Sequence, residues 1–139
     1  MKTWLVDTGP LIALLEEAEK HHAWVVEAVR AAPRPLLTCE AVLTEACFLL
    51  KRERRDPNDL LIMAQSGFFR VAFDFNREHS ALRDLLTRYA DRPMSFADAC
   101  LVRMAERHPD SPVWTLDSDF KIYRRNRHSS CLLYTSRCV

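Results

Sequence analysis

The sequence predicts an α/β fold, arranged as a three-layer α/β/α sandwich around a mostly parallel central sheet. Short apolar runs alternate along the chain with longer segments of helical periodicity. Two strands that are joined by a helix run parallel, so this alternation favours a parallel sheet covered by helices. A chain of 139 residues with 48% hydrophobic residues can bury one sizeable core. We therefore expect a single domain over residues 1–128.

The first half of the chain predicts two strands and three helices. The apolar run Trp4 to Val6 reads as a strand that ends at Asp7, and Pro10 suits the first turn of a following helix. Pro33 and Pro35 end the second helix, because proline cannot continue a helical hydrogen-bond ladder. In order, the expected elements are a strand at 4–6, helices at 11–15 and 21–31, a strand at 36–38 and a helix at 40–54.

The second half predicts two more strands between helices. Pro57 favours the start of a helix, and Gly67 follows its end. Pro93 interrupts the pattern again, and Ser95 is a suitable N-cap for the next helix. In order, the expected elements are a helix from 57 to 66, a strand at 69–73, helices at 77–89 and 97–107, and a strand at 112–116.

The last segment, residues 129–139, differs from the rest of the chain. It lacks a clear helical or strand register, and its stretch CLLYTS resembles the translation of a transposon-based sequencing adapter. We expect this segment to be of foreign origin, in place of a native terminal strand. The alternative is an ordinary edge strand from Cys131 to Tyr134.

Charge and cysteine content limit the classes of function. The formal net charge is only +1, so binding of a polyanion must depend on local patches. Five cysteines lie singly, without close metal-ligand spacing, which favours reduced thiols in a cytoplasmic protein. The acid at residue 7 breaks the first apolar stretch, so we expect neither a signal peptide nor a membrane span.

Four acids lie where the predicted fold would bring side chains together. Asp7 and Asp117 each follow a strand, and ligand sites of open α/β sheets form beyond the carboxyl ends of the strands. Asp98 and Glu45 each lie in line with the apolar positions of a helix, so we expect both to point inward. Clustered carboxylates repel one another, so either their pKa values rise or a cation neutralises them. An all-oxygen site suits Mg²⁺ or Mn²⁺.

Each acid also has a simpler explanation. Aspartate after a strand often forms a turn or caps a helix, which applies to Asp7, Asp117 and Asp119. Glu45 and Asp98 could lie at the edge of the apolar stripe and reach solvent. The four placements together favour a site over four separate accidents.

Four segments resemble the signature segments of PIN-domain ribonucleases. They are VDTGPLIALL around Asp7, LTEACFLL around Glu45, SFADACLV around Asp98 and TLDSDF around Asp117 and Asp119. The segments follow the family's order and spacing from the first strand to about residue 123. Within this family, the sequence is similar to the VapC-like toxins of bacterial toxin–antitoxin pairs.

The resemblance implies an endoribonuclease that uses one or two Mg²⁺ or Mn²⁺ ions, forms homodimers and has a cognate antitoxin. By position, Asp7, Glu45, Asp98 and Asp117 would be the catalytic acids, of which Asp7, Asp98 and Asp117 hold the metal directly or through water. Glu45 would hold a second ion or orient the attacking water. Asp119 is the alternative to Asp117 as the fourth acid, and Thr8 and Thr115 resemble supporting positions.

Two basic runs offer local positive charge for the RNA backbone. Lys51 and Arg52 belong to the first, and Arg124 and Arg125 to the second. Such residues at helix ends also complement the helix dipole, so a solvated face explains them equally well. The aromatic residues Phe120 and Tyr123 could stack on bases or simply pack in the core.

Other classes fit the sequence less well. A haloacid-dehalogenase phosphatase needs a second acid two residues after the first, where this chain has Gly9. A P-loop enzyme is excluded because the chain has two glycines in all, and a receiver domain gives Glu45 and Asp98 no role. The remaining alternatives are an RNA-processing nuclease of the same fold and a non-catalytic binding module.

Overall fold

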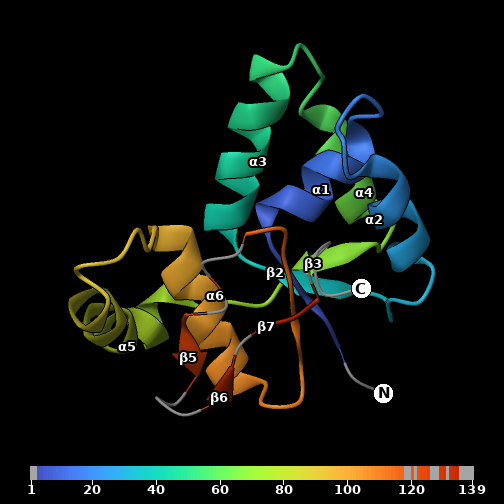
Figure 1. Cartoon of the computed structure of the whole chain (residues 1–139). Coiled ribbons are helices and arrows are strands. Elements are labelled where there is room, and N and C mark those ends of the chain that lie inside the picture. The colour runs from blue at the N-terminus through green and yellow to red at the C-terminus, as the bar shows by residue number, and fades with distance from the viewer. Residues whose placement is uncertain (1–2, 118–119, 121, 126–128, 131, 135–139) are drawn as a thin grey trace.

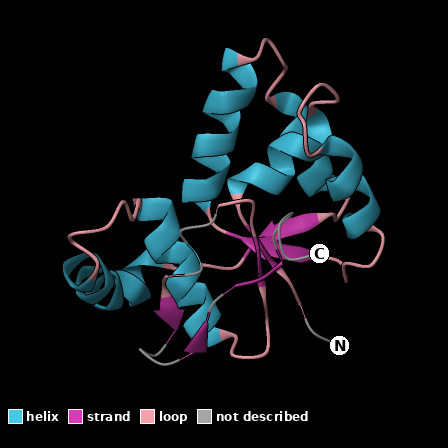
Figure 2. Ribbon diagram, in the orientation of Figure 1, coloured by secondary structure: helices cyan, strands magenta, loops and turns pink. Residues whose placement is uncertain are grey.

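The computed structural model describes residues 3–117, 120, 122–125, 129–130 and 132–134. Its centre is a sheet of parallel strands, and its outer layers are helices (Figure 2). Five described strands form this sheet in the order β3-β2-β1-β4-β7. They are β1 (Leu5–Val6), β2 (Leu36–Thr38), β3 (Phe69–Val71), β4 (Val113–Trp114) and β7 (Leu132–Tyr134). Every neighbouring pair in it is parallel, which confirms the expected class of fold.

Six helices in the described residues connect these strands. They are α1 (Thr8–Leu15), α2 (His22–Val29), α3 (Glu40–Arg52), α4 (Asn58–Gln65), α5 (Phe75–Arg88) and α6 (Phe96–Arg107). All of the helices predicted from the sequence are present. The largest difference is at α1, which starts three residues earlier than expected because the Asp7 side chain accepts a hydrogen bond from the Thr8 amide and caps the helix there. Helix α5 starts two residues earlier than expected, because Asp74 caps it in the same way through the Asn76 amide.

The helices lie in two groups. Figure 1 shows α1, α2 and α4 together on one side of the molecule and α5 with α6 on the other. Helix α3 stands between the groups and contacts both α1 and α6. Because α3 and α6 start near the same ends of the strands, side chains on the two helices can face one another across that edge of the sheet. No helix of the described residues is long and apolar enough to cross a membrane.

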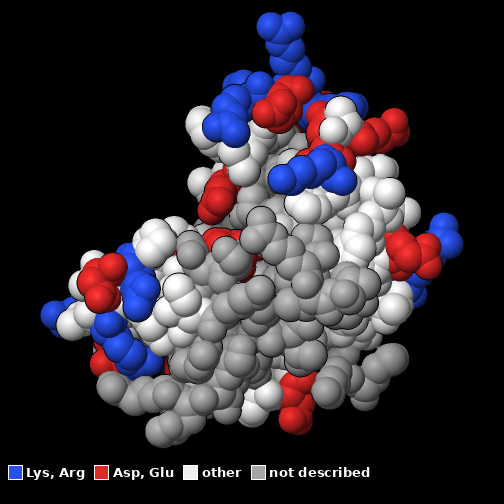
Figure 3. Space-filling model, in the orientation of Figure 1, with Lys and Arg blue, Asp and Glu red and all other residues white. Residues whose placement is uncertain are grey.

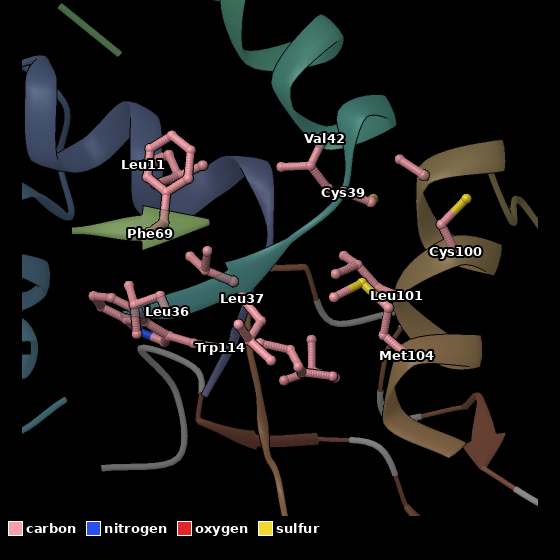
Figure 4. Close-up of a cluster of buried hydrophobic side chains, with 14 of the residues drawn as sticks. Leu11, Leu36, Leu37, Cys39, Val42, Phe69, Cys100, Leu101, Met104 and Trp114 are labelled. Carbon is pink, nitrogen blue, oxygen red and sulfur yellow. The ribbon is translucent and has the colours of Figure 1, made fainter. Parts of the chain in front are cut away.

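The core fills the space between the sheet and both groups of helices. Trp114, Phe69 and Leu36 from the strands pack with Leu11 of α1 and Leu101 of α6, and all of them are buried (Figure 4). A buried side chain of this size contributes about 1.5–3 kcal/mol to folding. The core therefore fixes α1 and α6 against the sheet, and with them the residues at the beginning of each helix.

The end of the described chain adds a small second sheet and the edge strand β7. Strands β5 (Arg124–Arg125) and β6 (Ser129–Ser130) pair antiparallel. Strand β7 pairs with β4, with an irregularity in register between Val113 and Trp114. Segment 129–139 thus contributes a strand at the sheet's edge, and its foreign origin stays a prediction.

Candidate metal-binding acidic site

Asp7 and Asp117 lie at the same edge of the sheet because β1 and β4 are neighbours. Leu5 pairs with Val113 in parallel register, and the Asp7 amide donates to the Trp114 carbonyl oxygen at 3.0 Å. Each aspartate follows the last residues of its strand. The chain beyond each strand therefore begins at the same end of the sheet, as expected for a site in an open α/β fold.

The buried Thr115 hydroxyl connects these two acids. It donates to Asp7 Oδ2 at 2.7 Å and accepts a hydrogen bond from the Asp117 amide at 2.9 Å. The other oxygen of Asp7, Oδ1, accepts from the Thr8 amide at 2.7 Å, at the N-terminus of α1. Both carboxylate oxygens of Asp7 are thus held in place. Thr115 thus contacts both Asp7 and Asp117, while its supporting role stays a prediction.

Asp98 is held at the start of α6. It forms a capping box with Ser95, in which the Ser95 hydroxyl accepts from the Asp98 amide at 3.0 Å and Asp98 Oδ2 accepts from the Ser95 amide at 3.1 Å. The Tyr123 hydroxyl donates to the same Oδ2 at 3.2 Å. Asp98 is buried, as predicted. This contact of Tyr123 could not be predicted from the sequence, because 25 positions separate the two residues and no local pattern links them.

The position of Glu45 differs from the expectation. The buried face of α3 consists of Val42, Ala46 and Leu50, whereas Glu45 is exposed and Phe48 is 65% exposed. The predicted inward face was wrong because the apolar residues of α3 cover more than one side of the helix. Glu45 instead faces the site from the wall that α3 forms.

One cavity of about 300 Å³ brings the four predicted acids together. Asp7, Glu45, Asp98 and Asp117 all line it, with Thr8 and Gly9 at its base. Figure 3 shows acidic side chains in the hollow beside α3. A fifth acid, Glu19, also lines the cavity. Glu19 is not predictable as a site residue from the sequence, because it lies in the loop after α1, outside any strand end or helical periodicity.

Burial and charge oppose ionisation of the two innermost acids. Burial raises the pKa of Asp7 from 3.8 to about 7, against the lowering effect of its hydrogen bonds from Thr115 and Thr8, and the nearby charges of Asp98 and Glu45 raise it further. Burial likewise raises the pKa of Asp98, and the charge of Asp117 adds to this effect. A positive ion in the cavity would offset both causes.

The chemistry of the donor groups suits a hard divalent cation with part of its water shell. The acids that line the cavity offer only oxygen ligands. As placed, no three His, Cys, Asp or Glu side chains of the described residues form a group that could hold an ion by themselves. Mg²⁺ commonly uses one or two carboxylates and keeps several waters. The site therefore fits an ion held by few direct carboxylate ligands and by bridging water.

The Thr8 hydroxyl is a buried polar group in the same cavity. Its oxygen is buried without a hydrogen-bond partner among the described residues, and Thr8 lines the acidic cavity. A buried hydroxyl without a partner costs about 1–3 kcal/mol. A water molecule bound to an ion in the cavity would satisfy it.

The remaining predicted residues lie elsewhere. Lys51 and Arg52 are exposed at the C-terminal end of α3, where basic side chains gather at the tip of the helix (Figure 3). Arg124 and Arg125 form β5, with only their backbone described, and Asp119 lies outside the described residues. Phe120 and Tyr123 are fully buried and pack edge to face, with ring centroids 5.2 Å apart, so they are core residues and do not offer free faces to bases.

The fold and the site together define an α/β protein with an all-carboxylate cavity at the carboxyl ends of its parallel strands. The chain belongs to the PIN domain family, whose model matches residues 4–126. It is 26% identical over 115 residues to Ribonuclease VapC26 of Mycobacterium tuberculosis. The aligned region covers 81% of this chain and 85% of that protein.

A solved structure shows the same fold. The crystal structure of VapC20 from Mycobacterium tuberculosis, described as a toxin that cleaves the sarcin–ricin loop, matches with a TM-score of 0.76 and 23% identity. The match covers 86% of this chain and 94% of that one. The likeness therefore extends over most of both chains.

Proposed function

We propose that this protein is a metal-dependent endoribonuclease that hydrolyses RNA phosphodiester bonds, and that it is the cytoplasmic toxin of a toxin–antitoxin pair. The observation that carries the proposal is the single cavity lined by Asp7, Glu45, Asp98 and Asp117 in a PIN domain. The ribonuclease name of the relative that covers 81% of the chain supports the reaction class. The toxin role, a cognate antitoxin and a homodimer rest on the same relationship.

The metal would be Mg²⁺ or Mn²⁺, held by Asp7, Asp98 and Asp117 directly or through water. Such an ion, when bound, lowers the pKa of a bound water and neutralises charge on the phosphate. Thr115 fixes the orientation of Asp7 by its 2.7 Å hydrogen bond, and Tyr123 and Ser95 fix Asp98. Partners of this kind typically change metal affinity or activity by about 10–100-fold when they are removed.

Glu45 is suited to a different role, because it reaches the cavity from an exposed helix face. From there its carboxylate can accept a proton from an attacking water or orient it. Asp7 and Asp98 are less suited to this step, since hydrogen bonds already occupy oxygens of both carboxylates. We assign proton transfer to Glu45 and metal binding to the aspartates.

The RNA backbone would run from the cavity along α3. Arg52 lies seven residues after Glu45, which is close to two helical turns, so both share one side of the helix about 10 Å apart along its axis. Lys51 lies on a different side by the same geometry. Within the described part of the chain, Arg52 forms a loose ion pair with the exposed Glu53, at 4.0 Å, which would leave its guanidinium accessible to a phosphate.

The test is RNA cleavage by the wild-type protein and by Asp98→Asn, with Asp84→Asn as matched control. Asp84 is 54% exposed on α5, away from the cavity. With Mg²⁺ or Mn²⁺, we expect Asp98→Asn to lose at least about 100-fold in rate, because the contribution of a bound metal ion to transition-state stabilisation is several kcal/mol. Asp84→Asn should cleave like the wild type, and EDTA should abolish cleavage until metal is restored.

The same variants test the toxin role. Expression of the wild type should arrest growth of the host cell, expression of Asp98→Asn should not, and co-expression of the product of an adjacent small gene should relieve the arrest. Equal cleavage by wild type and Asp98→Asn, or none by a well-folded wild type, would contradict the nuclease. Cleavage without growth arrest would favour an RNA-processing enzyme.

A further inference from the structure

Two cysteines from distant parts of the chain meet beside the acidic site. Cys39 is the N-cap of α3, directly after β2, and Cys100 lies on the buried face of α6. The two thiols are neighbours that line one cavity, and Figure 4 shows them on facing elements. Both are free thiols, buried to within 1%. The sequence offers no hint of this pair, because 61 positions separate its members.

A cavity separate from the acidic one reaches this pair. Its volume is about 440 Å³, and both cysteines line it together with residues of the β3–α5 connection and the start of α6, including Phe73, Asp74 and Phe96. One water occupies about 30 Å³ of the liquid. The cavity is therefore large enough for a small oxidant to reach sulfur atoms that are shielded from larger reagents.

The surroundings of Cys39 favour it as the reacting sulfur. Cys39 is the N-cap of α3, and its neighbours Cys100, Val42 and Ala41 lower the pKa of its thiol, although burial opposes this effect. A cysteine at a helix N-terminus with a lowered pKa is more reactive towards oxidants. Cys100 is the neighbour that can complete a disulfide.

We propose that Cys39 and Cys100 are a modification site, at which a peroxide forms a reversible disulfide that slows RNA cleavage. The Cys39 thiolate attacks one peroxide oxygen, the O–O bond breaks, and Cys39 becomes a sulfenic acid as the other oxygen leaves as water. The Cys100 sulfur then attacks the Cys39 sulfur, and the sulfenic oxygen leaves as a second water. Two thiols thus lose two electrons to one peroxide, and a thiol reductant reverses the change.

The disulfide would displace Asp98 and Asp7, because both are linked to the two cysteines through only a few bonds. A disulfide fixes the sulfur–sulfur distance at about 2.05 Å and its dihedral angle at about 90°, so it would tie α6 to the start of α3 in one geometry. Asp98 lies two residues before Cys100, and the Thr38 hydroxyl, next to Cys39, donates to the Val6 carbonyl oxygen beside Asp7. A misplacement of about 1 Å in a catalytic site can cost about 100-fold in rate. This consequence rests on the proposed nuclease function.

The pairing is tested first without any activity. The full-length protein is treated with hydrogen peroxide, free thiols are alkylated, and peptides are mapped by mass spectrometry. We expect a linked pair of peptides containing Cys39 and Cys100, absent in Cys39→Ser and Cys100→Ala and retained in Cys47→Ser. Cys47 lies on α3 but outside the cavity, and serine is a good N-cap at position 39. Absence of this link in the wild type, or a link from Cys39 to another cysteine, would overturn the proposal.

The consequence is tested by cleavage and by Mn²⁺ affinity before and after oxidation. We expect peroxide to lower the cleavage rate about tenfold or more in the wild type and in Cys47→Ser, with recovery after dithiothreitol, and to leave Cys39→Ser and Cys100→Ala unchanged. A mapped disulfide with unaltered cleavage and unaltered Mn²⁺ affinity would refute the regulatory effect. If the reduced protein cleaves no RNA, the proposed function fails, while the peptide map still decides the pairing.

Discussion

Asp7 is a buried carboxyl group whose pKa is raised by its burial. It is 7% exposed and is held by the Thr8 amide and the Thr115 hydroxyl. Two hydrogen bonds normally favour a carboxylate, yet burial outweighs them and raises the pKa of Asp7 to about 7. The metal-free protein therefore bears the cost of an acid that prefers to stay protonated, and a bound cation would remove that cost.

The raised pKa of Asp7 makes the free energy of unfolding of the metal-free protein depend on pH. Between pH 3.8 and about 7 the folded state keeps the Asp7 proton that the unfolded state has lost, so the free energy of unfolding falls as pH rises through this range. Three pKa units correspond to about 4 kcal/mol. Relative to wild type, Asp7→Asn should therefore gain stability progressively, from little difference near pH 4 to a gain of up to about 4 kcal/mol above pH 7.

Urea unfolding in EDTA across this pH range measures the effect. Asn resembles the protonated form of Asp7, with one oxygen that accepts from the Thr8 amide and one donor group that faces the Thr115 hydroxyl. The change of the stability difference with pH therefore reports the charge. Mn²⁺ should stabilise the wild type above pH 7 more than it stabilises Asp7→Asn, because the ion binds the ionised form of the site. Parallel pH profiles for the two proteins in EDTA would refute the raised pKa.

The sequence predicts single residues well where a local pattern identifies them. Asp7 and Asp98 were found because strand ends and helix periodicity are short-range features, and Ser95 was found as a cap for the same reason. Contacts made across the fold were not predictable: Thr115 to Asp7 spans 108 positions and Tyr123 to Asp98 spans 25. Neither period nor spacing encodes such pairs, which depend on how strands and helices are placed in three dimensions.

Helix α6 carries Asp98. One buried acid of the neighbouring helix α5 forms hydrogen bonds to α6. Glu78 of α5 accepts hydrogen bonds from Arg103 and, at 2.7 Å, from Nη2 of Arg107, both on α6. The hydrogen bonds from Arg107 and Arg103 lower the pKa of Glu78 despite its burial. Because this pair of helices forms one side of the molecule, the contact positions α6 relative to the sheet (Figure 1).

We expect Glu78→Ala to lower the free energy of unfolding by about 2 kcal/mol. Loss of one partner of a fully buried ion pair costs ~3–5 kcal/mol, and the cost is lower here because the side chain of Arg107 is 57% exposed. Asp84→Ala is the matched control on α5: it breaks an exposed ion pair with Arg88, which should cost less than about 1 kcal/mol. Chemical denaturation measures the free energy of unfolding of both variants. Equal losses would show that the buried Glu78 stabilises the fold no more than an exposed ion pair does.

Element positions were more predictable than their arrangement. Each helix from α1 to α6 coincides with a periodic segment of the sequence that is bounded by proline, glycine or a capping residue. These signals act over a few residues. The predicted strand at 69–73 is shorter, since pairing ends at Val71. The order of the sheet, with β4 beside β1, does not follow from any local signal. It results from burying the apolar faces of all the elements at once.

At the scale of the whole molecule, the described surface has large apolar side chains next to the acidic cavity. Phe48 of α3 is 65% exposed and Phe96 of α6 is 48% exposed. Both line an open groove of about 700 Å³, and Glu45 lines this groove as well as the acidic cavity. Exposed aromatic residues that line a groove are typical of protein interfaces, so we assign this surface to the proposed homodimer.

The homodimer can be tested by a charge in that groove. A twofold dimer buries two Phe48 side chains, one from each subunit, so Phe48→Asp removes at least about 3 kcal/mol of apolar burial. This corresponds to a rise in the dimer dissociation constant of at least about 100-fold. Ile62→Asp is the control, because Ile62 is 58% exposed on α4 and lies outside the groove. Sedimentation velocity over a concentration series should show dimers for wild type and Ile62→Asp and monomers for Phe48→Asp. A monomeric wild type, or a dimer that Phe48→Asp leaves intact, would exclude this surface as the interface.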